Sequence, residues 1–61
     1  MKIQITAPSG NKLYYTGKAG AEYVSTDINS AFEFGDIRGA QIRAVQFASR
    51  LGSLYKVEVA A

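Results

Sequence analysis

The residues that most often do chemistry in proteins are scarce in this chain. It has no histidine and no cysteine, and its carboxylates show no paired spacing: they are Glu22, Asp27, Glu33, Asp36 and Glu58. General acid–base catalysis near neutral pH most often uses histidine, and a serine nucleophile needs a base held beside it. We therefore expect no catalytic residue and no enzymatic activity.

Metal and cofactor sites are not expected either. The usual zinc sites need thiolate or imidazole ligands, and STDINS supplies one acid where a calcium loop needs oxygen ligands across about a dozen residues. The segment KLYYTGKA contains Gly17-Lys18, as a phosphate-binding loop does. However, Lys12 stands where the first glycine should be, and Ala19 replaces the serine or threonine that would hold magnesium. STDINS and the Gly17-Lys18 part of the second segment are both predicted to be plain turns.

The residues that could bind a partner are concentrated in the segment 35–52, GDIRGAQIRAVQFASRLG, in which apolar residues recur with the period of an α-helix. Asp36 is expected to cap this helix and Gly52 to end it. A spacing of 3.6 residues predicts one core-facing stripe of Ile37, Ala40, Ala44, Phe47, Ala48 and Leu51.

On the far side of this helix lie two apolar residues, Ile42 and Val45. Four polar residues are expected to rim them: Arg38, Arg43, Gln46 and Arg50. An apolar centre with an arginine-rich edge is typical of a protein-binding surface. A lone exposed isoleucine is also common and often has no role, so that alternative stays open.

Five strands are expected to position this helix. Period-two alternation or β-branched and aromatic content indicates strands at residues 1–7, 12–17, 21–26, 31–34 and 54–60, with turns at APSGN and GKAG. The predicted class is α+β: an antiparallel-rich sheet of four to five strands with one helix packed on one face, in the order β-β-β-β-α-β. Short connectors and a right-handed crossover favour a sheet with the last strand beside the first.

The other sheet face is expected to be uncovered and mildly basic. It would carry Lys2, Gln4, Lys12, Tyr14 and Lys56. Sheets that bind single-stranded nucleic acid combine basic grooves with stacking aromatics, so this face is the alternative nucleic-acid site. One tyrosine is a small platform, and a net charge of +2 is modest for a protein that binds phosphates.

The chain of 61 residues is long enough for one domain but for only a thin core. Scaling predicts about 3,900 Å² of folded surface. Apolar burial then contributes about 85 kcal/mol against an ordering cost of about 90 kcal/mol. Since disulfides and zinc are excluded, a second copy of the chain, bound through the helix at residues 35–52 or through an edge strand, is the expected source of further stabilisation. No apolar run suggests a signal peptide or membrane span, so we expect a soluble cytoplasmic protein.

From Ile28 onward, AFEF followed by AVQFASRLGSLYKVEV resembles small phage- and prophage-encoded accessory proteins. Such proteins typically act by binding, are often dimers, and include inhibitors of host defence systems. The resemblance therefore implies a non-enzymatic homodimer that binds or masks a larger protein. Two alternatives remain: a weak nucleic-acid-binding module that uses the open sheet face or the helix arginines, and a structural subunit of a larger assembly.

Overall fold

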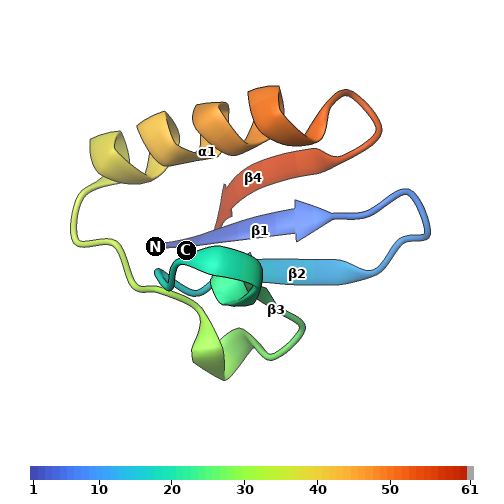
Figure 1. The fold of residues 1–61 in the computed structure, drawn as a ribbon. Helices are drawn as coiled ribbons and strands as arrows, with labels where there is room; N and C mark the ends of the chain where they lie inside the picture. The colour runs from blue at the N-terminus through green and yellow to red at the C-terminus, as the bar shows by residue number, and fades with distance from the viewer. Residues whose placement is uncertain (61) are drawn as a thin grey trace.

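Alternating apolar and polar residues build a four-stranded sheet in the computed structural model, which describes residues 1–60 (Figure 1). Its strands are β1 (Lys2–Thr6), β2 (Lys12–Tyr15), β3 (Val24–Ser25) and β4 (Lys56–Ala60). The helix α1 (Ile37–Leu51) packs on the sheet, and two 3₁₀ helices, η1 (Gly20–Tyr23) and η2 (Ile28–Ser30), flank β3. The predicted α+β class is confirmed.

The strand order is β3-β2-β1-β4, and every neighbouring pair is antiparallel. The last strand therefore lies beside the first, in the predicted position. In the ladder of β1 and β4, Ile3 is opposite Val59 and Ile5 is opposite Val57. Since side chains directly across a ladder share a face, these four residues form one apolar surface under α1.

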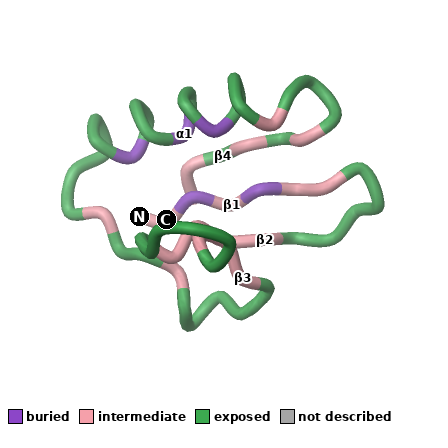
Figure 2. The backbone as a smooth tube through the Cα atoms, viewed as in Figure 1, coloured by how far each residue is buried: buried purple, intermediate pink, exposed green. Residues whose placement is uncertain are grey.

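The core is small and lies between β1 and α1. In Figure 2 the buried parts of the backbone lie on β1 and α1. Ile3 and Ile5 are completely buried, and they cluster with Ala44 and Phe47 of the helix. The alanine lets the helix backbone approach the sheet, while Phe47 fills the remaining space among the aromatic rings. The chain exposes 4099 Å², close to the area that scaling predicts for this size.

The ends of α1 lie where the sequence predicted them. The Asp36 carboxylate accepts a hydrogen bond from the Arg38 backbone N–H (3.0 Å), and Gly52 ends the helix with φ of 89°. The predicted core stripe is too wide, however. Ile37 is 53% exposed and Ala48 is also exposed, because the buried residues Ala40, Ala44 and Phe47 occupy a narrower arc of the helix surface, and these two residues lie at its edge.

The predicted strand at residues 31–34 is wrong. This segment crosses the ends of two strands: the Phe32 N–H donates to Tyr15 O (2.7 Å) and the Phe34 N–H donates to Met1 O (2.8 Å). The rings of Phe32 and Phe34 lie edge to face at 4.8 Å, and both pack on Tyr15. The crossing satisfies the backbone donors and carries the chain from the β3 side of the sheet to the start of α1.

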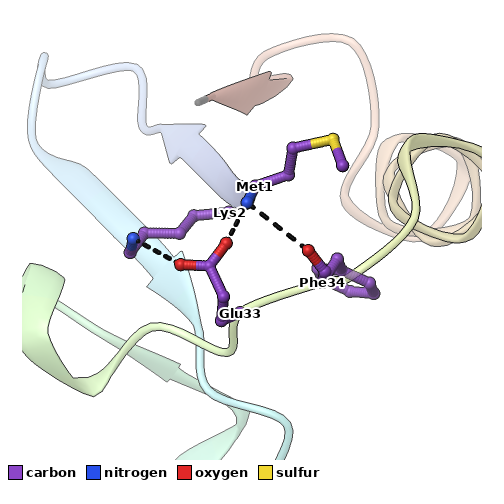
Figure 3. A network of polar contacts seen from close by, with 4 residues as sticks. All are labelled: Met1, Lys2, Glu33 and Phe34. Atoms are coloured by element: carbon purple, nitrogen blue, oxygen red, sulfur yellow. Dashed lines mark hydrogen bonds and ion pairs between the residues drawn. The ribbon is translucent and has the colours of Figure 1, made fainter.

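Glu33 links the crossing segment, residues 31–34, to the start of β1. Its carboxylate accepts from the Met1 amino group and from Lys2 Nζ, the latter at 2.9 Å (Figure 3). These hydrogen bonds, first the one from the amino group and then the one from Lys2, lower the pKa of Glu33 from 4.5 to about 2.

The third predicted strand is shorter than residues 21–26. Its first half forms η1, and only Val24 and Ser25 pair with β2. The Thr16 N–H donates to Tyr23 O (2.9 Å), and Gly17 and Gly20 both have positive φ. The two glycines turn the chain sharply here, so residues 17–23 form a wall beside β2 instead of a long strand.

Candidate functional site

The outer surface of α1 divides into two parts. The first, which we call the helix crest, consists of Arg38, Ile42 and Val45. Ile42 is 56% exposed and Val45 is 68% exposed. At 100° per residue, Ile42 is nearly opposite the buried stripe, while Arg38 lies one turn before Ile42 and two turns before Val45.

The other three predicted rim residues, Arg43, Gln46 and Arg50, lie on the flank of α1 that faces β2. The Arg43 guanidinium carbon is 5.9 Å from the centre of the Tyr15 ring, and its Nη1 donates to Gln46 Oε1 (3.1 Å). A guanidinium at this distance from an aromatic face gains cation–π attraction. The predicted continuous rim is therefore distributed over two sides of the helix.

This flank borders a hollow of about 430 Å³, which we call the basic hollow. The floor is aromatic, and cations rise from both walls. Arg43 and Arg50 come from α1, and Lys18 comes from the turn before η1. The complete lining is Tyr15, Gly17, Lys18, Ala19, Gly20, Tyr23, Arg43, Phe47 and Arg50.

Aromatic packing holds the floor of the basic hollow in place. Phe47 stacks on Tyr23 with ring centres 5.7 Å apart, and Tyr15 tilts against Phe47 at 4.9 Å. Tyr15 and Tyr23 are half-buried, so each contributes both to the core and to the hollow. A floor built from packed rings is rigid, which reduces the entropy lost when a ligand binds.

The charges of the basic hollow are unbalanced. No acidic residue lines it, and among residues 1–60 none of Lys18, Arg43 and Arg50 forms an ion pair. Several positive charges around a concave surface produce a strong positive potential inside it. The arrangement can attract carboxylates or phosphates.

The five residues of the predicted nucleic-acid face do share one face of the sheet. Gln4 is opposite Tyr14, and Thr6 is opposite both Lys12 and Lys56. Two of the three lysines have acidic partners, however. Lys2 binds Glu33, and Lys56 Nζ lies 3.6 Å from a carboxylate oxygen of Glu58 on the same face.

The basic hollow contains residues that the sequence did not single out as binding residues. Lys18 was interpreted only as part of a turn, and Tyr15 and Tyr23 only as strand residues. Lys18 lies 25 positions before Arg43 in the sequence, and only the tertiary fold brings their elements together. The one sequence signal was the pair of glycines around Lys18, which predicted a sharp turn.

Three further observations bear on function. No group of three or more potential metal-ligating residues comes together within residues 1–60. In the same part of the chain, no helix is both long and apolar enough to cross a membrane. The chain matches no protein-family model, no curated protein and no solved structure.

Proposed function

We propose that this chain is a non-enzymatic protein-interaction module that acts as a small homodimer and binds or masks a larger protein. The proposal depends on one observation: the helix crest, with the exposed Ile42 and Val45, lies next to the basic hollow, whose three cations form no ion pair within residues 1–60. Protein interfaces combine an apolar centre with arginine and aromatic residues. The surface suits a partner that presents an apolar contact beside carboxylates.

The partner is proposed to contact both parts of this surface. Ile42 and Val45 would supply the apolar contact, and Arg43 and Arg50 would bind carboxylates, with Gln46 between them holding Arg43 in position. Arg38 would bind at the crest and Lys18 at the opposite wall of the hollow. The setting that we propose is the cytoplasm of a bacterial host, where the chain would inhibit a defence system; this part rests on the resemblance to phage accessory proteins.

Partner capture with surface variants tests the proposal. The immobilised chain is incubated with nuclease-treated host lysate, and captured proteins are compared among wild type, Ile42→Glu, Arg43→Glu/Arg50→Glu and the control Lys12→Glu. Lys12 is exposed and lies on the opposite face of the sheet. We expect one protein that both α1 variants lose and the control retains. Equal capture by all four chains contradicts the proposed surface.

A weak nucleic-acid-binding module is the second candidate, favoured by the position of three unpaired cations beside Tyr15. The two candidates differ in their response to salt. Binding through several phosphates weakens steeply as salt increases, whereas a contact with an apolar centre responds little. The two candidates are distinguished by measuring the affinity for single-stranded DNA and RNA by fluorescence anisotropy at about 50 mM and about 200 mM salt.

A further inference from the structure

The two edges of the sheet differ in their capacity to pair with another strand. On one side β3 has two residues, while on the other β4 has five and pairs only with β1 within residues 1–60. The strand β4 contains no proline, and its register with β1 is continuous from Lys56 to Ala60. Edge strands with these properties are templates for pairing with another chain.

Burial shows that the β4 edge is incompletely covered. Val57 and Val59 point to the same face as their partners Ile5 and Ile3 on β1. The isoleucines are completely buried, but both valines are only half-buried. The difference arises because a further strand lies beyond β1 and none beyond β4 in the described chain, so a strand added there would cover the valines.

Ladder geometry identifies the backbone groups that point outward from β4. Met1 O accepts from Phe34 on the side of β1 away from β4, since the same crossing segment is bonded to β2. Backbone N–H and C=O groups alternate in direction from one residue of an antiparallel strand to the next. Gln4 is three residues after Met1, so its groups point to the opposite side of β1, toward β4. Its partner Glu58 therefore directs its N–H and C=O to β1. The residues on either side of Glu58, Val57 and Val59, therefore present N–H and C=O to the free edge.

Charge distinguishes two registers for the pairing of β4 with a second β4, centred on neighbouring residues. If a twofold axis passes through Val57, Lys56 of each copy is opposite Glu58 of the other, on the open face. If the axis passes through Glu58 instead, the two Glu58 carboxylates face each other. Opposite charges across a ladder stabilise pairing, and like charges directly opposite destabilise it, so the first register is favoured.

The helix is compatible with this arrangement. Its buried residues pack on the isoleucines of β1, so α1 lies over the β1–β4 pair. Neighbouring strands are about 4.8 Å apart, which places two such helices about 10 Å from each other, an ordinary packing distance. Arg43 approaches β2, so the opposite flank of α1, with Ile37 and Ala48, faces the second copy.

We infer that the chain dimerises by antiparallel pairing of β4 with β4 of a second copy, centred on Val57, to form a continuous eight-stranded sheet. This inference rests on the homodimer of the proposed function and specifies its contact. The flank of α1 with Ile37 and Ala48 would add apolar contact area to the dimer interface, beside the paired strands. Ile42, on the crest of the helix, stays outside the contact and is free for a partner.

Charge reversal with rescue tests the contact. Lys56→Glu and Glu58→Lys each place like charges opposite one another twice in a dimer, so each should raise the dimer dissociation constant roughly tenfold or more. An equimolar mixture of the two variants, and the double variant Lys56→Glu/Glu58→Lys, should restore wild-type dimerisation. The controls are Lys12→Glu and Glu22→Lys, which make the same charge changes away from β4.

Sedimentation velocity over a concentration series, with circular dichroism to show that each variant is folded, gives separable outcomes. Loss of the dimer in both single variants and its return in the mixture support the inference. A wild-type dimer that both variants retain overturns the β4 contact and leaves the homodimer standing. Failure of the mixture to recover overturns the register. A wild-type chain that is monomeric at all concentrations overturns both the contact and the proposed homodimer.

Discussion

Gly17 gives a sharp test of the crossing segment, the part of the fold that the sequence did not predict. Its φ is +81°, and a Cβ added there would lie 2.6 Å from Cδ1 of Phe32. Gly17→Ala therefore has two costs: the left-handed backbone conformation and the collision with the ring. Gly10 is the matched control, because its φ is +93° but an added Cβ meets nothing within 4 Å.

The magnitude of the collision follows from what the Phe32 ring would lose by moving. Phe32 is 44% exposed and can swing outward, but it would then leave Tyr15 at 6.0 Å and Phe34 at 4.8 Å. Each aromatic pair contributes about 0.5–1.5 kcal/mol, so the collision costs about 1–3 kcal/mol. The backbone conformation costs about 1–2 kcal/mol in either glycine variant.

We therefore expect Gly17→Ala to lower the free energy of unfolding by about 2–5 kcal/mol and Gly10→Ala to lower it by about 1–2 kcal/mol. Urea denaturation measures both, at one protein concentration, because self-association contributes to apparent stability. In a Phe32→Ala background the excess cost at Gly17 should disappear. Equal costs at the two glycines, unaltered by Phe32→Ala, would refute the placement of the ring against Gly17.

Three further predictions concern the fixed parts of the fold. Because folding lowers the pKa of Glu33 to about 2, its contribution to stability is complete above its ordinary pKa of 4.5 and is lost as pH falls toward 2; Glu33→Gln should flatten the dependence of the melting temperature on pH in this window. Phe47→Ala should cost about 3–5 kcal/mol of unfolding free energy in urea denaturation, since the side chain is 5% exposed. Asp36→Ala should cost about 1 kcal/mol in the same assay through loss of the α1 cap, and Asp27→Ala, which uncaps only the three-residue η2, should cost less.

Local sequence patterns were sufficient for the elements whose stabilising contacts are local. The bounds of α1 follow from Asp36 and Gly52, and the existence of β1 and β4 follows from their own alternating residues. The position of β4 beside β1 was predicted correctly, but from a crossover that assumed a strand at residues 31–34. The segment 31–34 has the alternation of a strand, but four residues with two phenylalanines also fit a crossing over strand ends. Tyr15 O and Met1 O decide between these structures, and both acceptors are distant in sequence.

The candidate site shows the same limit. The helical period correctly predicts that Ile42 faces away from the core, because that depends on α1 alone. The helical period does not predict that Arg43 and Arg50 border a hollow, because the hollow is formed together with Tyr15 and the turn at Lys18, which belong to other parts of the chain. A residue's face can be read from its own helix, but its binding partners depend on tertiary structure.

The two proposed contacts use opposite flanks of α1, and this has a consequence for affinity. Pairing through β4 places the twofold axis at the outer edge of that strand, whereas the basic hollow lies on the flank toward β2. A homodimer of this form keeps both hollows accessible, one on each side of the axis. Two linked sites bind a partner with matching repeated surfaces far more tightly than one site does, since the second contact forms within the complex. Dimerisation through β4 would thus stabilise a thin core and double the binding surface through the same contact.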